Sequence, residues 1–158
     1  MTLDVQTLHD HLQALANLAD IPIAPDEIRI ISQKAPHKPP SSLPSGKMAV
    51  YIFVYNGQCL KVGKVGSKSN ARYTSQHYYP GSSNSNLAKS IMANPAKVGL
   101  CSIDAANVGE WIKNQTDRID ILFTIELGIP FLTLAESFLQ YWLKPTFEGF
   151  ESQKHSSS

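Results

Sequence analysis

The chain has 158 residues, of which 42% are hydrophobic, and its formal net charge is +1. This length predicts one domain with a single sizeable core, and the hydrophobic share excludes an intrinsically disordered chain. The N-terminus lacks the pattern of an export signal, and no segment approaches the roughly 20 apolar residues of a membrane helix. A cytoplasmic protein without membrane partners is therefore expected.

The charges are unevenly distributed along the chain. Residues 28–103 contain ten of the fourteen Lys and Arg residues and no Asp or Glu. The flanking residues 1–27 and 104–158 contain five and eight acids respectively. A basic stretch without acids indicates a polyanionic partner, such as a nucleic acid.

The first 45 residues are predicted to be helical and then extended. Leucines at near-helical spacing predict a helix over residues 3–19, with Thr2 as its N-cap. A second short helix is expected to begin near Pro25 and to end before Pro36, because Pro and acids favour a helix start. Residues 35–46 contain four prolines and are expected to form a linker.

The clearest strand pattern covers residues 48–55, which are rich in β-branched and aromatic side chains. Asn56 and Gly57 follow directly, and this pair predicts a tight hairpin because both residues tolerate a positive φ. The second strand of the hairpin is expected over residues 58–65.

The remaining elements are predicted from periodicity and from the prolines that end them. Helices are expected over residues 68–79, 84–93 and 130–143, and strands over residues 97–103 and 119–126. This order predicts an α+β fold in which the hairpin and a third strand form a small antiparallel sheet flanked by helices. The predicted domain covers residues 46–151, after an N-terminal helical extension and linker (1–45) and before a flexible tail (152–158).

The hairpin and the residues after it contain an ordered set: Tyr51, Gly63, Arg72, Glu136 and Pro145-x-Phe147. This pattern resembles the GIY-YIG nuclease superfamily. Ala49-Val50-Tyr51 lies in the place of the first tripeptide, and Lys61-Val62-Gly63 lies in the place of the second. Arg72 follows at the spacing of the family's helical Arg, and Glu136 corresponds to its metal-binding Glu. The resemblance extends over about residues 48–150 and implies a small antiparallel sheet flanked by helices.

Two positions depart from the family pattern. Lys61 replaces the second Tyr, and Glu148 stands after Pro145-x-Phe147, where the family usually has Asn. Glu148 is expected either to add a second carboxylate to the metal site or to be a surface turn residue.

The resemblance implies a role for each matched residue. Glu136 would hold one divalent metal, Mg²⁺ or alternatively Mn²⁺, and Arg72 would bind the phosphate oxygens. Tyr51 would orient or deprotonate the attacking water, and deprotonation requires a lowered phenol pKa. Lys61 is expected to lower that pKa or to contact the scissile phosphate. His77 would act at the edge of the cleft as a proton shuttle or a phosphate donor.

These residues predict a metal-dependent endonuclease that hydrolyses DNA, with RNA as the open alternative. The residues expected to contact nucleic acid are Lys64, Lys68, Tyr78 and Lys89. The departures at Lys61 and Glu148 motivate a second hypothesis, a nucleic-acid-binding module with weak or no catalysis. A third is an interaction protein that forms a homodimer, or binds a protein partner, through the N-terminal helix.

Overall fold

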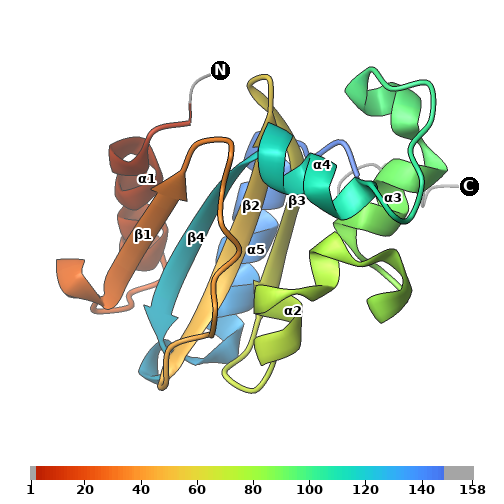
Figure 1. Ribbon diagram of the computed structural model, residues 1–158. Helices are drawn as coiled ribbons and strands as arrows, with labels where there is room; N and C mark the ends of the chain where they lie inside the picture. The colour runs from red at the N-terminus through yellow and green to blue at the C-terminus, as the bar shows by residue number, and fades with distance from the viewer. Residues whose placement is uncertain (1–2, 148–158) are drawn as a thin grey trace, which may run out of the picture.

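The computed structural model describes residues 3–147, which form an α+β structure around one antiparallel sheet. The sheet has four strands in the order β1-β4-β2-β3, and each neighbouring pair is antiparallel (Figure 1). The strands are β1 (Ile28–Gln33), β2 (Lys47–Tyr55), β3 (Gln58–Val65) and β4 (Asp117–Thr124). The predicted fold class is confirmed at this level, and β1 is a strand of the sheet that was not predicted.

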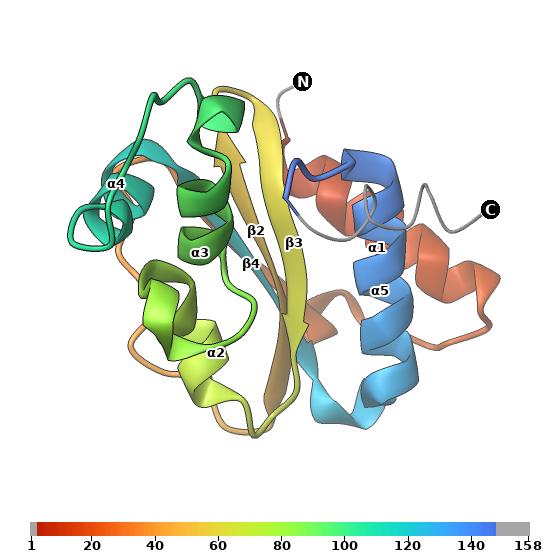
Figure 2. The same cartoon turned by 90° about the vertical axis from the view of Figure 1, so that its right-hand side faces the viewer.

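Helices cover both faces of the sheet, as Figure 2 shows. One face carries α1 (Val5–Leu18) and α5 (Gly128–Leu143), and the other carries α2 (Asn70–Thr74), α3 (Leu87–Ala93) and α4 (Val108–Gln115). The central strand β2 is therefore buried on both sides. Its even-numbered side chains pack toward α1 and α5, whereas its odd-numbered side chains pack toward α2, α3 and α4.

The β2–β3 hairpin forms as predicted. Asn56 and Gly57 have φ values of 49° and 74°, which the tight turn requires. The helix predicted over residues 3–19 is also present as α1. Its N-cap is Asp4, whose carboxylate accepts a hydrogen bond from the Thr7 amide at 2.8 Å, and not Thr2, which lies outside the described residues.

The prediction of a helix between Pro25 and Pro36 is wrong. Only Pro25–Glu27 form a 3₁₀ turn, and the chain then enters strand β1. The edge of β4 supplies backbone partners along the whole of β1, so tertiary pairing decides the structure of this segment. Residues 28–33 thus belong to the same sheet as the hairpin.

Two further predictions need correction, and one helix was not predicted. The strand expected over residues 97–103 is absent, because a 3₁₀ turn (Pro95–Val98) is followed by Gly99 with a φ of 75°. Helix α4 was not predicted. The helix expected over residues 68–79 ends at Thr74, and a 3₁₀ turn covers Gln76–Tyr78. Within the described part of the chain, no helix has the length and apolar character needed to cross a membrane.

Candidate functional site

The predicted catalytic residues lie on and beside the hairpin. Tyr51 on β2 is opposite Gly63 on β3. A Cβ atom at Gly63 would overlap with the phenol oxygen and Cζ of Tyr51, so only glycine leaves room for this ring. The glycine of the second tripeptide therefore has a steric reason: it accommodates the hydroxyl end of Tyr51.

Lys61 lies on the same face of the sheet as Tyr51, next to a β-bulge in β3. Phe53 pairs with Lys61 but Val54 pairs with Cys59, so Leu60 is an extra residue in β3. Because directly opposite residues share a face, Lys61 points to the side of the sheet covered by α2, α3 and α4. Its side chain is buried, with a relative exposure of 2%.

Tyr51 is fully buried, and no described residue meets the geometry of a hydrogen bond to its hydroxyl, although the Arg72 guanidinium lies close enough to interact with it. Burial raises its pKa to about 12; Arg72 lowers the pKa, but not enough to offset burial, and Glu136 raises it further. The expectation that Lys61 lowers the pKa of Tyr51 is therefore wrong for this structure. The alternative role of Lys61, a contact with the scissile phosphate, stays a prediction.

His77 packs directly against Tyr51, with the two ring centroids 4.6 Å apart. An uninterrupted helix would turn His77 away from Arg72, but α2 ends before it and the 3₁₀ turn directs the ring onto the sheet. Burial, together with the charges of Lys61 and Arg72, lowers the pKa of His77 to about 2. A proton-shuttle role at neutral pH is thus contradicted, whereas a role as phosphate donor remains open.

Arg72 and Glu136 flank the hydroxyl of Tyr51 closely enough for their charges to act on its pKa. Arg72 is half-buried, and its Nη1 donates a hydrogen bond to the Ser85 carbonyl at 3.3 Å. Its guanidinium therefore retains donors for an incoming ligand.

Glu136 is the carboxylate on α5, and its partner is Lys64 of β3. The Lys64 Nζ lies 3.0 Å from the Glu136 Oε1, with exposed side-chain fractions of 36% and 16%. A charge in this apolar helix is costly without a partner, and Lys64 supplies that partner. Lys64 was expected to bind nucleic acid, and here it neutralises the proposed metal ligand instead.

A metal site at Glu136 would depend on few protein ligands. Among residues 3–147, no group of three or more His, Cys, Asp or Glu side chains could hold a metal ion. Mg²⁺ is nevertheless commonly held by one or two carboxylates together with water and substrate phosphate. The partly exposed carboxylate of Glu136 fits that mode, and Glu148 lies outside the described residues.

The other predicted nucleic-acid contacts divide into two kinds. Lys68 and Lys89 are exposed, as the prediction requires. Tyr78 is only 3% exposed, so the predicted contact of its side chain with nucleic acid is wrong. Its neighbour Tyr79 is 60% exposed and is the aromatic side chain of this turn that solvent reaches.

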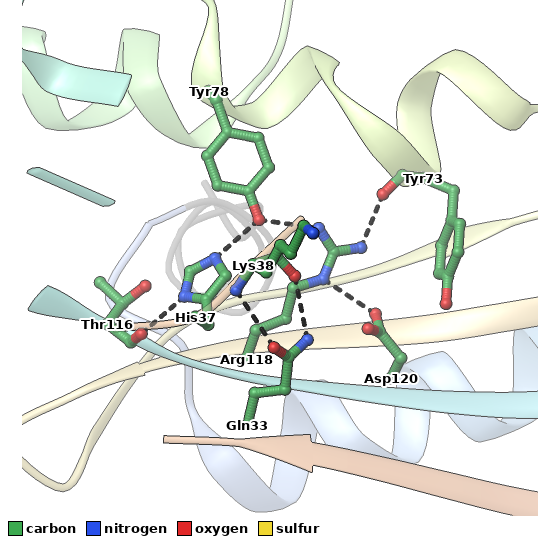
Figure 3. Close-up of polar contacts among 8 residues, drawn as sticks. All are labelled: Gln33, His37, Lys38, Tyr73, Tyr78, Thr116, Arg118 and Asp120. Carbon is green, nitrogen blue, oxygen red and sulfur yellow. Dashed lines mark hydrogen bonds and ion pairs between the residues drawn. The ribbon is translucent and has the colours of Figure 1, made fainter. Parts of the chain in front are cut away.

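A buried charged network centred on Arg118 of β4 was not predicted from the sequence (Figure 3). Arg118 is fully buried and donates from Nε to the Asp120 carboxylate at 3.0 Å. Its Nη1 donates to the Tyr78 hydroxyl at 2.9 Å, and its Nη2 donates to the Tyr73 carbonyl at 2.6 Å. An Arg and an Asp two residues apart on an apolar strand share one face, and this spacing was the available signal.

His37 extends this network into the segment that the sequence predicted to be a linker. Its Nδ1 lies 2.7 Å from the Thr116 carbonyl, which can only accept, so Nδ1 carries the proton. The Nε2 atom then accepts from the Tyr78 hydroxyl at 2.7 Å, while that oxygen accepts from Arg118. Residues around His37 are thereby fastened to the sheet.

The network positions the candidate site. Arg118 holds Tyr73 and Tyr78, which directly follow Arg72 and His77 in the chain. A guanidinium bonded through all three of its nitrogens thus anchors both ends of the turn that carries the two site residues.

No protein-family model matches the chain, and comparisons with curated proteins and with solved structures found no match either.

Proposed function

We propose that the protein is a metal-dependent phosphodiester hydrolase of the GIY-YIG type, acting on DNA. The observation that carries this proposal is that the Tyr51 hydroxyl lies against Gly63, where the charges of Arg72 and Glu136, from two other elements, act on it. Buried polar groups without partners are rare in folded proteins, so the unpartnered hydroxyl of Tyr51 calls for a functional explanation.

The residues divide the reaction between them. Arg72 binds the non-bridging oxygens of the phosphate through its planar fork, and Lys61 adds positive charge on the same face. Tyr51 remains protonated at neutral pH and orients the attacking water by accepting a hydrogen bond from it. Water attacks phosphorus, one P–O ester bond breaks, and a proton from the water ends on the leaving hydroxyl.

Glu136 supports this reaction as the metal ligand. A Mg²⁺ or Mn²⁺ ion at its carboxylate would supply Lewis-acid charge to the phosphate. Lys64 would then leave Glu136 and become free to contact the nucleic-acid backbone, which reconciles its ion pair with the predicted role.

The second candidate is a nucleic-acid-binding module without cleavage. It is favoured by the raised pKa of Tyr51 and by the neutralisation of Glu136 by Lys64. Both observations describe a protein that retains the charged face but lacks an activated base.

Cleavage of supercoiled plasmid separates the two candidates. The hydrolase proposal expects nicking with Mg²⁺ or Mn²⁺, none with EDTA, and a loss of at least about 100-fold in Glu136→Gln and in Arg72→Ala. The matched controls Glu126→Gln and Arg29→Ala change exposed residues and should keep full activity. Retarded migration of the plasmid without nicking would instead support the binding module.

A further inference from the structure

We propose that His77 is a hydrogen-bond donor whose proton stays on Nε2, and that it forms with the Tyr51 hydroxyl a buried subsite for one anionic oxygen. The proposed function identifies that oxygen as a non-bridging oxygen of the phosphodiester, so this identity rests on that proposal. The two-donor arrangement itself rests on the geometry of the described residues.

The tautomer of His77 follows from its backbone partner. The Leu87 amide lies 3.2 Å from the His77 Nδ1 and can only donate a hydrogen bond. Nδ1 must therefore be unprotonated, and the proton of the neutral ring is on Nε2. The backbone at the start of α3 thus fixes which nitrogen faces the site.

Two neighbouring polar atoms lack partners. The His77 Nε2 and the Tyr51 hydroxyl are buried without a hydrogen-bond partner among the described residues, and their rings are in contact. An N–H donor of this kind is costly to bury without an acceptor. An oxygen acceptor placed between the two residues would satisfy both of them.

The surrounding charges select the ligand. Burial, reinforced by the charges of Lys61, Arg72 and Arg118, keeps the His77 ring neutral, and burial also keeps the Tyr51 hydroxyl protonated. Glu136 is the acid whose charge acts on that hydroxyl. Two uncharged donors among three cations favour an anionic oxygen over a neutral ligand or a cation.

The half-buried Arg72 indicates the route of entry. Its bond to the Ser85 carbonyl is long, at 3.3 Å, and its guanidinium is the most exposed of the cations acting on His77. An anion that takes Arg72 away from Ser85 would bring one oxygen to the Nε2 of His77.

The tautomer and the subsite can be observed directly in the full chain by ¹⁵N NMR of the imidazole rings. We expect His77 to show a protonated Nε2 and an unprotonated Nδ1 from pH 5 to pH 8. Titration with a short oligonucleotide in EDTA should shift its Hε2 signal. A matching shift with inorganic phosphate would mean that any phosphate oxygen is accepted. Ionisation of His77 in this range, or no shift with either ligand, would overturn the proposal.

Two substitutions distinguish a donor from a proton shuttle. His77→Gln places an amide N–H near the position of Nε2, whereas His77→Phe removes every donor. We expect His77→Gln to bind the oligonucleotide within about threefold of the wild type and His77→Phe to bind at least about tenfold more weakly. Equal losses in both variants would contradict the donor role.

Two further variants test the subsite independently of the His77 substitutions. Tyr51→Phe removes the second donor and should weaken binding even if His77→Phe fails to fold, which thermal unfolding would reveal. His9→Gln on α1 is the matched control and should bind normally. A wild type that shifts His77 with phosphate but does not nick plasmid would retain the subsite and reject the hydrolase.

Discussion

The two faces of the same sheet are built from different chemistry. The face under α1 and α5 is an apolar core of aliphatic and aromatic side chains. The opposite face, under α2, α3 and α4, combines a second apolar cluster with buried charge at Lys61, Arg118 and Asp120. The first face therefore contributes stability through packing, and the second accepts the cost of buried charge because hydrogen bonds offset it.

The buried polar groups of the second face differ in how well they are satisfied. Arg118 is bonded through three nitrogens, and the Tyr78 hydroxyl has two partners. Tyr51 and His77 each have one polar atom without a partner among the described residues. The satisfied groups make a scaffold, and the unsatisfied pair lies where we place the ligand.

Among the substitutions that test this difference between the two faces, Arg118→Met is expected to lower the free energy of unfolding most. The change leaves the Asp120 carboxylate buried without its cation, so the free energy of unfolding should fall by about 3–5 kcal/mol. Urea denaturation measures this loss. Arg29→Met, at an exposed position of β1, should stay within about 0.5 kcal/mol of the wild type. A loss as small as that control would mean that the network is not a scaffold.

Leu12→Ala tests the apolar face. Leu12 is fully buried on α1, so its truncation should lower the free energy of unfolding by about 3 kcal/mol. Because it is on the opposite side of the sheet from His77, the ¹⁵N signals of that ring should not move. A displaced His77 signal in Leu12→Ala would show that the two faces are coupled.

The buried, unprotonated state of His77 predicts how the free energy of unfolding depends on pH. Its folded-state pKa of about 2 lies below the ordinary value of 6.5, so the unfolded chain gains a proton first as the pH falls. Stability is therefore unaffected above about pH 6.5 and is lost below it, by about 2–3 kcal/mol at pH 4.5.

This loss is measured by urea denaturation of the wild type and of His77→Gln across the same pH range. The difference between the two proteins removes the contribution of other titrating groups, His37 included. Parallel pH profiles would mean that His77 is protonated in the folded protein.

The smallest effect is expected from Tyr78→Phe. The change removes the donor to His37 and one acceptor of Arg118, so unfolding should cost about 1–2 kcal/mol less. Tyr79→Phe is the matched control, because Tyr79 is exposed and should be neutral. Equal stabilities of the two variants would place the Tyr78 hydroxyl outside the scaffold.

Local signals predicted a large part of the fold. Alternation and aromatic content identified β2, and the Asn56-Gly57 pair identified its hairpin. Periodicity identified α1 and α5. These elements were predictable because each carries its own pattern over at least eight residues.

The segments whose structure was not predicted correctly depend on partners that are distant in the sequence. β1 is a strand because β4 offers it a backbone edge. Helix α4 contains Gly109, where a Cβ would meet the Tyr78 carbonyl at 2.6 Å, so close packing and not helix propensity requires that residue. Sequence patterns do not contain either contact.

The residue types of the candidate site were predictable from the sequence, but their burial, protonation and hydrogen-bond partners were not. The sequence by itself determined the hairpin, the basic stretch and the order of Tyr51, Arg72 and Glu136. Only the tertiary structure decided that Tyr51 and His77 are buried side by side, that Leu87 fixes the tautomer of His77, and that Lys64 neutralises Glu136. The physical reason is that a pKa and a hydrogen bond depend on burial and on neighbours brought from elsewhere in the chain.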